Sequence, residues 1–481
     1  ESTIKEKNAK CNGKVYKNYR LFITDNQSVE NFKKIGFFSN FKQERLKKHR
    51  YISLRKKRTM YFSDKLVCRK IKNIEEVDNI SKVYDLSVDK NHSFIANGII
   101  SHNSGKSYTL GVIAEELANL PENVANNIAT LIFDTMGIFW TMAYENEKES
   151  ELIKKWNITP KKMPVRIFVP YGYYKEYENI GIPISKPFAI KTSELDADDW
   201  ILTFGLEMLS PVSILIQRVV GLLKEKKKEY DLDDLIYFLK NDRESNPEDK
   251  AAAINLFEAA LTWGVFARKH ESGTSVKELI SGGHTSILDL SPYSAIGTFN
   301  VRALVIGLVI KKLFRERMIS RKLEEIQAVQ HGMEYLYYKE KREMPLVWLL
   351  IDELHEFLPE KGKTAATSAL IQLLREGRQP GLSLVGATQQ PAKIHSDVWT
   401  QSDIVISHRV TSKPDIDALS TIMQSYLPES INAYMNNLPS AKGSAIILDD
   451  NSERIYPMRI RARMTWHGGE APTSVKVKRR I

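Results

Sequence analysis

The sequence predicts an α/β protein with a mostly parallel sheet, preceded by a smaller segment rich in β-strands. Residues 346–351 form an uninterrupted apolar run of strand length that ends in two acidic residues, as buried parallel strands do. Residues 106–120 carry leucine and isoleucine at helical spacing directly after a Gly-Lys sequence. Residues 83–103 alternate apolar and polar side chains, which predicts a pair of short strands.

Charge divides the chain near residue 103. The protein has 481 residues and a formal net charge of +11, and this length is enough for two or more domains. Residues 1–103 hold 23 Lys and Arg against 11 Asp and Glu, and the remainder has a net charge of −1. A strongly basic protein favours a nucleic-acid partner, but here the positive charge belongs to the first segment alone.

Composition also gives expectations about compartment and completeness. With only Cys11 and Cys68, no signal-like beginning and no apolar run near the ~20 residues of a membrane span, we expect a cytoplasmic protein with no membrane partner. Because the chain begins with Glu1 rather than Met, we expect it to be part of something longer.

The junction between the two segments carries residues suited to peptide-bond cleavage. The side-chain amide of Asn103 can attack its own backbone carbonyl and so cut the bond to Ser104. His102 is placed to protonate the leaving amine, and the Ser104 hydroxyl can accept an upstream chain as an ester.

The stretch "VYDLSVDKNHSFIANGIISHN" (residues 83–103) resembles the C-terminal splicing motifs of inteins. The resemblance implies that His92 assists the cyclisation and that Asp85 helps to activate the downstream nucleophile. It also implies that residues 59–103 are the C-terminal part of an all-β Hint-type splicing domain. Splicing would then require the upstream half of the intein.

Residues 1–58 resemble the C-terminal tail of a LAGLIDADG-type homing endonuclease domain, which is an α+β fold. A strand is expected near residues 20–25, and a helix near residues 28–37. The acidic dodecapeptide that supplies the catalytic carboxylates of such nucleases is not visible in this sequence. The basic run at residues 42–58 either gripped a DNA backbone in the whole endonuclease or is a solvated linker.

The residues after the junction look like half of a phosphate-binding loop. The full motif is G-x-x-x-x-G-K-[ST], but Ile100 stands where its first glycine is required. We interpret this as an intein inserted within the loop, so that an upstream piece supplies the glycine half. Gly105 and Lys106 are then expected to bind the phosphates of ATP, and Ser107 to ligate Mg²⁺.

Two later strands end in polar residues that complete such a site. Asp352 is expected to hold Mg²⁺ through water in the Walker B manner, while Glu353 acts as general base. Gln389, within Thr-Gln-Gln after residues 381–387, is suited to sensing the γ-phosphate. In open α/β sheets, ligands bind beyond the carboxyl ends of the strands, where all these residues fall.

Residues 104–481 resemble the HerA-like branch of the HerA/FtsK superfamily of hexameric motors. The shared stretches are "LIFDTMGIFW", "WLLIDELHEFLP", "LLREGRQPGLSLVGATQQP" and "DIVISHRVTSKPDIDAL". The resemblance implies a RecA-like P-loop ATPase fold, a homo-hexamer, double-stranded DNA as substrate and a possible partner nuclease. It also implies an arginine finger directed at a neighbouring subunit, for which Arg378 or Arg375 is the candidate, with Arg409 behind them.

Three further segments have no motif. A helical subdomain is expected at about residues 194–282, a long projecting helix at residues 321–343, and a flexible basic tail at about residues 467–481. The sequence as a whole predicts an ATP-hydrolysing DNA translocase or helicase subunit that carries the C-terminal part of an intein. The alternative is an autocatalytic splicing element fused to a P-loop ATPase that moves something other than DNA.

Overall fold

The structure is a computed structural model of the whole chain. It describes residues 2–11, 14–23, 60–62, 67–69, 93–96 and 99–102, and then residues 105–469 with gaps. The gaps fall at 228, 269–270, 295–299, 332–341, 343, 411–412, 424–433, 436, 440, 451 and 453. Two compact units are distinguished, residues 1–85 with 95–99 and residues 86–94 with 100–481, and each is described by itself.

The first hundred residues contribute three separate pairs of strands. β1 (Ser2–Cys11) and β2 (Lys14–Ile23) pair antiparallel, as do β3 (Met60–Phe62) and β4 (Val67–Arg69). β5 (Ser93–Ala96) and β6 (Ile99–His102) form the third two-stranded sheet, within the stretch where alternation predicts a strand pair. β2 covers most of the strand expected near residues 20–25, while the helix expected near residues 28–37 lies outside the described residues.

A six-stranded parallel sheet is the centre of the larger unit. Its order is β12-β11-β7-β10-β8-β9, and every neighbouring pair is parallel. The strands are β7 (Ile128–Asp134), β8 (Val165–Pro170), β9 (Lys186–Phe188), β10 (Thr285–Asp289), β11 (Leu346–Ile351) and β12 (Leu382–Gly386). The fold class expected from the sequence, an α/β unit with a mostly parallel sheet, is therefore confirmed for this part of the chain.

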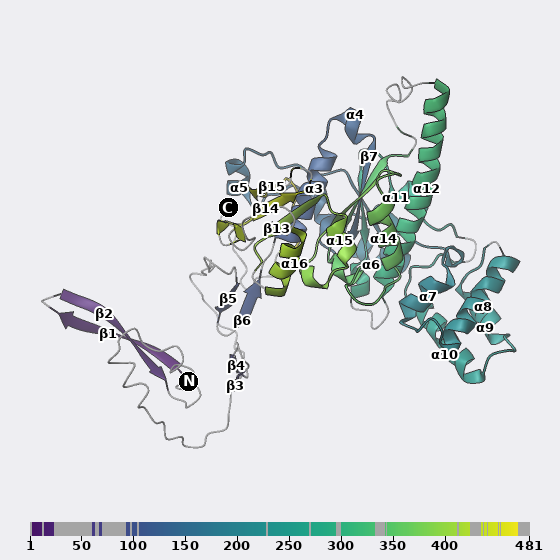
Figure 1. Cartoon of the computed structure of the whole chain (residues 1–481), viewed down its shortest axis with the longest axis horizontal. Coiled ribbons are helices and arrows are strands. Elements are labelled where there is room, and N and C mark those ends of the chain that lie inside the picture. The colour runs from purple at the N-terminus through teal and green to yellow at the C-terminus, as the bar shows by residue number, and fades with distance from the viewer. Residues whose placement is uncertain are drawn as a thin grey trace, which may run out of the picture. The chain divides into compact units, whose positions relative to one another are not determined.

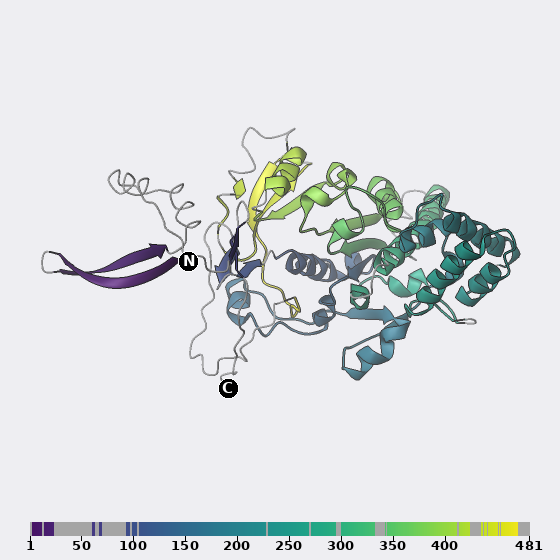
Figure 2. The same cartoon turned by 90° about the horizontal axis from the view of Figure 1, so that it is seen from below.

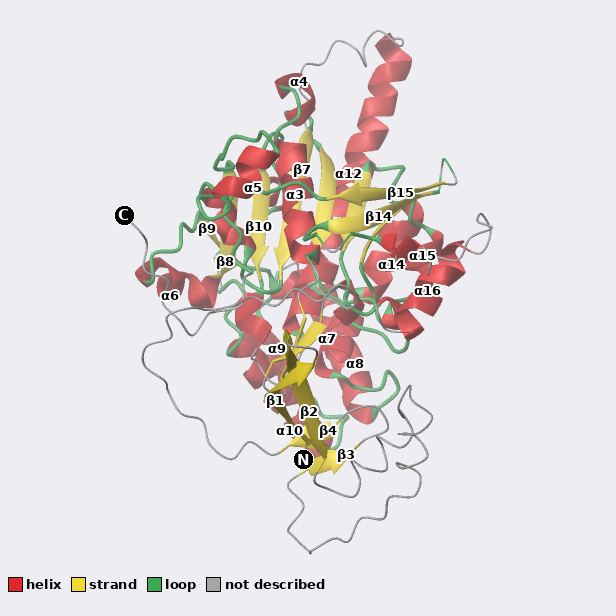
Figure 3. Cartoon of the chain, turned by 90° about the vertical axis from the view of Figure 1, so that its left-hand side faces the viewer, coloured by secondary structure: helices red, strands yellow, loops and turns green. Residues whose placement is uncertain are grey.

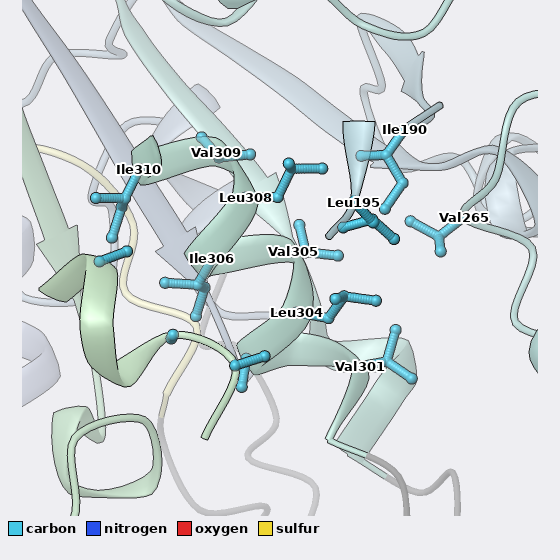
Figure 4. Close-up of a cluster of buried hydrophobic side chains, with 14 of the residues drawn as sticks. Ile190, Leu195, Val265, Val301, Leu304, Val305, Ile306, Leu308, Val309 and Ile310 are labelled. Carbon is cyan, nitrogen blue, oxygen red and sulfur yellow. The ribbon is translucent and has the colours of Figure 1, made fainter. Parts of the chain in front are cut away.

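Helices cover both faces of the sheet (Figures 1 and 3). α3 (Lys106–Ala118) lies on one face, where Leu110 and Ala114 pack against Ile132 and Leu350. α12 (Val301–His331) and α14 (Thr367–Glu376) lie on the other. Because neighbouring residues of a strand point to opposite faces, Leu131 and Leu349 pack on that second side. Figure 4 shows the buried side chains of α12 that gather there.

A group of helices follows β9 and lies beside the sheet (Figure 2). It consists of α7 (Ala197–Phe204), α8 (Pro211–Lys226), α9 (Leu232–Lys240), α10 (Pro247–Leu261) and α11 (Val276–Leu279). α8 begins at Pro211 because the side chain of Ser210 accepts the N–H of Ser213, and α9 is capped by Asp231 in the same way. Trp200 and Phe257, whose ring centroids are 5.0 Å apart, fix the centre of the group.

α12 leaves the body of the unit and projects beyond the sheet (Figure 1). It starts earlier than the helix expected at residues 321–343, and its first half is among the most buried parts of the protein. Arg317 fixes the point of departure, because its buried guanidinium donates to the carbonyls of Pro380 and Met344 at 2.7 and 2.8 Å. Residues 332–341 lie outside the described residues.

The last three described strands form a second sheet. β13 (Ile404–His408), β14 (Ser444–Asp449) and β15 (Arg454–Arg459) pair antiparallel in this order. The other helices of the described residues are α4 (Glu122–Ala125), α5 (Ser150–Lys155), α6 (Tyr174–Asn179), α15 (Ser396–Thr400) and α16 (Lys413–Met423). Within the described ranges, no helix combines the length and the apolar character that crossing a bilayer requires.

The segment after β15 is packed onto α3. Glu115 of α3 is fully buried and accepts hydrogen bonds from Arg461, Arg463, Met464 and Thr465. His467 also packs edge-on against the ring of Tyr108, so the first residue of the tail expected at residues 467–481 is attached to the body. Residues 470–481 lie outside the described residues.

Candidate active site at the carboxyl ends of the parallel strands

The half-loop begins with a glycine in the left-handed region. Gly105 has φ 73°, and its carbonyl accepts the backbone N–H of Thr109 at 3.0 Å as the first turn of α3 forms. A glycine takes up this conformation at little cost, whereas other residues do so at roughly 1–2 kcal/mol. Gly105 therefore turns the chain into α3, and as the N-cap residue it makes no side-chain hydrogen bond to the first turn, the end of a helix that attracts anions.

Ser107 and Asp352 meet although 245 positions separate them. The hydroxyl of Ser107 donates to the carboxylate of Asp352, which is 1 % exposed at the end of β11. α3 packs on β7, the neighbour of β11, so the start of the helix faces the carboxyl end of that strand. The structure thus brings together the two residues expected to hold Mg²⁺.

Lys106 lies beside the two acidic residues that follow β11, Asp352 and Glu353. Burial lowers the pKa of its ammonium group, and the nearby charges of Glu353 and then Asp352 oppose that shift. The ammonium is thus partly desolvated and faces two carboxylates. A phosphate that binds against this ammonium would exchange part of its hydration water for a compact positive charge.

Glu353 occupies a backbone conformation that glutamate rarely adopts. Its φ is 50°, one of two positive values among the described non-glycine residues. Gln389 donates its amide to Glu353 Oε1, while Oε2 is buried and accepts no hydrogen bond. One oxygen of the expected base is therefore fixed by the residue expected to sense the γ-phosphate, and the other, although buried, keeps its acceptor capacity unused.

His355 contacts residues of both loops that follow β11 and β12, and this role was not predicted from the sequence. Its Nδ1 lies 3.0 Å from Thr388 Oγ1 and 3.5 Å from Glu353 Oε2. Its Nε2 lies 3.2 Å from the Gln390 amide nitrogen. If that amide donates, the ring is neutral with its proton on Nδ1, directed toward Thr388 and Glu353. The only sequence signal was its position two residues after Glu353.

His408 contacts the other side of the half-loop and was also missed. Its Nε2 is 2.8 Å from Thr109 Oγ1, and its Nδ1 is 3.2 Å from the Ser444 carbonyl. Burial lowers its pKa, and the charge of Lys106 lowers it further. The Thr109 hydroxyl also donates to the Gly105 carbonyl at 3.0 Å, so the contacts of His408 with Thr109 and Ser444 hold β13 against the start of α3.

The three candidate finger arginines have different surroundings. Arg375 pairs with Asp397 of the same chain at 2.8 Å. Arg409 donates to the carbonyl of Leu438. Arg378 is exposed in the turn before β12, where the described residues offer it no ion-pair partner. Because the carboxyl end of β12 faces the phosphate site, Arg378, which precedes the amino end of this strand, lies at the other end of the parallel strands.

A buried pair of aspartates stands one strand away from the acidic pair. Asp134 and Asp289 are register partners at the ends of β7 and β10, and both are almost fully buried. Burial raises the pKa of Asp134 to about 7, with the charge of Asp289 adding to the effect, and burial also raises the pKa of Asp289. The N–H groups of Gly137 and Phe139 donate to Asp134 at 2.8 and 2.7 Å, so this carboxyl organises the loop after β7.

The residues proposed for splicing are mostly beyond structural description. Asp85, His92, Asn103 and Ser104 lie outside the described residues. His102 ends β6, and only its backbone is described.

The donor set around Ser107 fits magnesium rather than a metal held by the protein alone. Mg²⁺ favours oxygen ligands and is usually held by one or two carboxylates together with substrate phosphates. Ser107 and Asp352 supply such oxygens. In the part of the chain that the structure describes, no group of three or more His, Cys, Asp or Glu is placed to hold a metal ion.

Comparisons with known proteins match the part of the chain that holds this site. Residues 104–311 match the family described as the central domain of helicase HerA. The DNA double-strand break repair helicase HerA of Pyrococcus furiosus is 24 % identical over 148 residues, which are 29 % of this chain and 26 % of that protein. A probable helicase of the same name from Methanocaldococcus jannaschii is 28 % identical over 119 residues, 23 % of this chain and 24 % of that protein.

Two further similarities are of a different kind. A DNA polymerase of Thermococcus litoralis is 37 % identical over 75 residues, which are 16 % of this chain and 4 % of the polymerase. The solved structure of the bacterial conjugative coupling protein TrwBdeltaN70 aligns with a TM-score of 0.44 at 13 % identity, over 76 % of this chain and 86 % of that one.

The chain matches about a quarter of the length of the two HerA relatives. Together with the family match, they support a HerA-like P-loop ATPase in the segment that begins at residue 104.

Proposed function

We propose that the segment from residue 104 onward is the ATP-hydrolysing motor of a DNA translocase or helicase. The contact between Ser107 and Asp352, with Lys106 beside it, carries this proposal. It joins the two halves of a nucleoside-triphosphate site from distant parts of the sequence, at the strand ends where such ligands bind.

Each residue of the site has a separate role in the transfer of the phosphoryl group to water. Lys106 and the first N–H groups of α3 would bind the β- and γ-phosphates and stabilise their charge. Ser107 and Asp352 would hold Mg²⁺, which would supply positive charge to stabilise the negative charge of the transferred phosphoryl group. Glu353 would accept a proton from the attacking water at Oε2, while Gln389 keeps the carboxylate oriented through Oε1.

Arg378 is proposed to complete the site of a neighbouring copy. Its place at the other end of the parallel strands prevents it from reaching the phosphates of its own chain, and it stands exposed. An exposed arginine that cannot reach the site of its own chain supports a ring in which each subunit completes the site of its neighbour. We propose that this ring is a hexamer. Arg375 is the weaker candidate because Asp397 already neutralises it.

Double-stranded DNA is the proposed substrate, and the support is the similarity to HerA helicases. A partner nuclease is proposed on the same ground. The near-neutral charge of residues 104–481 does not itself favour DNA. DNA-stimulated ATP hydrolysis by the protein joined at Ser104 tests the proposal: stimulation of at least several-fold by duplex DNA supports it. Hydrolysis that no DNA stimulates would favour a motor for another polymer.

Protein splicing at the Asn103–Ser104 bond is proposed as the second activity. The order of intein-like residues from Asp85 to Asn103 supports it. The HerA family match also begins at residue 104.

The splicing proposal has its own test. Co-expression of the upstream half should yield a joined protein that begins the Gly105 half-loop with new residues, which intact-mass spectrometry detects. Asn103→Ala has no amide to close the ring, so it should block release at Ser104. Efficient release of a fragment starting at Ser104 from that variant would show that the bond is not an intein boundary.

A further inference from the structure

Arg378 stands in a closed turn between α14 and β12. The N–H of Leu382 donates to the carbonyl of Gly377 at 2.8 Å, and the N–H of Gly381 donates to the carbonyl of Arg378 itself at 3.3 Å. Gly381 has φ 78°, and a Cβ at this position would lie 2.5 Å from Leu346 Cδ2 at the start of β11. The backbone of the turn is therefore packed against β11, while the side chain of Arg378 is exposed.

Arg317 holds this turn from the interior of the protein. It belongs to α12, which packs against α14 (Figure 1). Its fully buried guanidinium donates from Nε to the carbonyl of Pro380, two residues after Arg378, and from Nη1 to the carbonyl of Met344. Because a guanidinium is planar and its donors are fixed in one geometry, it sets the distance between the two carbonyls that it joins. One buried side chain thus fixes where the turn lies relative to the start of β11.

A second arginine shares the carboxylate partner of Arg317. Glu324 lies 3.3 Å from Arg317 and 2.8 Å from Arg342. The side chain of Arg342 is 35 % exposed, and its backbone N–H donates to Asn127 at 2.7 Å. Of these two arginines, Arg317 is the one that contacts the turn. Arg342 therefore offers a matched control for the loss of a guanidinium beside Glu324.

α14, the helix that leads to the turn, is fixed at its beginning as well. Thr367, its first residue, is buried, and its hydroxyl donates to the carbonyl of Phe357 at 3.2 Å. Phe357 is fully buried and follows Glu353 by four residues. Since the helix starts from this fixed point, the position of Arg378 depends on the turn at its far end, which Arg317 holds.

We propose that Arg317 is a positioning residue for Arg378, and that it holds the turn so that the exposed guanidinium of Arg378 reaches the γ-phosphate bound by the neighbouring subunit. This inference rests on the role between subunits that is proposed above for Arg378. Arg317 contacts neither the nucleotide nor the neighbour and acts through the backbone of the turn. Because a displacement of about 1 Å can lower a rate by about 10²-fold, a small shift of this turn is enough to impair hydrolysis.

Hydrogen–deuterium exchange in the chain of 481 residues tests the effect on the turn. Arg317→Lys keeps a positive charge beside Glu324 but cannot hold both carbonyls in the same geometry. The amide of Gly381 should then exchange at least about 10-fold faster, while the amide of Leu349 in the centre of β11 keeps its parental rate. Arg342→Lys makes the same change beside the same carboxylate and should leave both amides unchanged. Parental exchange at Gly381 in Arg317→Lys would overturn the inference.

Mixed assemblies of the protein joined at Ser104 test whether Arg317 acts through Arg378. Arg378→Ala subunits supply an intact Glu353, and Glu353→Gln subunits supply an intact Arg378, so their mixture should hydrolyse ATP. Arg317→Lys added to the Glu353→Gln subunit should lower this activity by about 10- to 100-fold. Added to the Arg378→Ala subunit, it should leave most of the activity, because that subunit offers no arginine to its neighbour. Gly381→Ala strains the same turn and should show the same asymmetry, so it decides the matter where Arg317→Lys does not assemble.

The outcomes separate this inference from the proposed function. An equal loss in both placements would overturn the inference, because Arg317 would then only stabilise the fold. No loss in either placement would also overturn it, and the recovered activity would leave the role of Arg378 intact. If the mixture without Arg317→Lys hydrolyses no ATP although the parental protein does, the role of Arg378 between subunits is contradicted, and the inference falls with it.

Discussion

Glu353 combines an unusual backbone conformation with an oxygen that accepts no hydrogen bond. The left-handed conformation costs roughly 1–2 kcal/mol for a residue with a side chain, and the surrounding contacts must offset that cost. Gln389 and His355 are placed to do so, one on each carboxylate oxygen. The arrangement fixes the carboxylate of a glutamate at the end of a buried strand and leaves its buried Oε2 with acceptor capacity that no hydrogen bond uses.

The first prediction concerns this carboxylate. In the joined protein, Glu353→Gln should lower the rate of ATP hydrolysis by about 10²–10⁴-fold, because the amide keeps the size of the side chain and removes its basicity. Titration with a fluorescent ATP analogue should show nearly unchanged affinity. Hydrolysis close to the parental rate would assign the base elsewhere, although Glu356, the next candidate by sequence, is paired with Arg302 at 2.8 Å.

A second prediction concerns the pair Asp134 and Asp289. The pKa of Asp134 is raised to about 7, so the folded protein keeps a proton that the unfolded chain loses near pH 4. The contribution of this group to stability is therefore full below about pH 4 and falls as the pH rises toward 7. Asp289→Asn removes the negative neighbour, lowers the pKa of Asp134 and should make that fall smaller.

Urea unfolding at about pH 5 and about pH 7.5 measures the effect. The difference in unfolding free energy between the two pH values should shrink in Asp289→Asn relative to the parent protein. An unchanged or larger difference would show that the two carboxyls do not interact.

At the scale of elements, α3 depends on the segment that follows β15. Glu115 and Arg463 are both fully buried, and Arg461 adds a second cation at 2.7 Å. Truncation of Glu115 to alanine leaves Arg463 buried without its carboxylate and should cost about 3–5 kcal/mol of unfolding free energy. Glu116 is the matched control, because it pairs with Arg461 at the surface, where such contacts contribute about 1 kcal/mol or less.

Denaturant unfolding of both variants checks this prediction. Equal losses for Glu115→Ala and Glu116→Ala would contradict the role of the buried carboxylate. A loss confined to Glu115→Ala would establish that the residues after β15 stabilise the helix that follows the phosphate loop.

The sequence predicted the elements that carry strong local patterns and missed those fixed by distant contacts. The apolar run at residues 346–351 coincides with β11, and the partnership of Ser107 with Asp352 followed from motifs on either side of it. His355, His408 and Asp289 were missed because their roles come from partners up to 299 positions away. The attachment of residues 461–467 was missed because a short polar segment carries no periodicity.

In the proposed ring of subunits, neighbouring copies complete each other's ATP sites. Arg378 is the residue that would do so. In the joined protein, Arg378→Ala should lower hydrolysis by about 10³-fold or more, as for other arginine fingers. Arg375→Ala should retain most activity, because that side chain pairs with Asp397 of its own chain.

Mixing of variants tests whether the arginine acts between subunits. Arg378→Ala and Glu353→Gln subunits should each be nearly inactive alone and should recover part of the activity when mixed. The mixed assembly contains sites with an intact Glu353 beside a neighbour with an intact Arg378. No recovery, combined with a strong loss in Arg375→Ala, would transfer the role to Arg375.

The central claim is that Lys106, Ser107, Asp352 and Glu353 form an ATP site that is complete only after joining at Ser104. Equilibrium binding of a fluorescent ATP analogue with Mg²⁺, measured on the chain of 481 residues and on the joined protein, tests it most directly. The account predicts saturable binding by the joined protein, its loss in Lys106→Ala, and little binding by the unjoined chain. Tight binding by the unjoined chain that Lys106→Ala abolishes, or binding by the joined protein that survives Lys106→Ala, would contradict it.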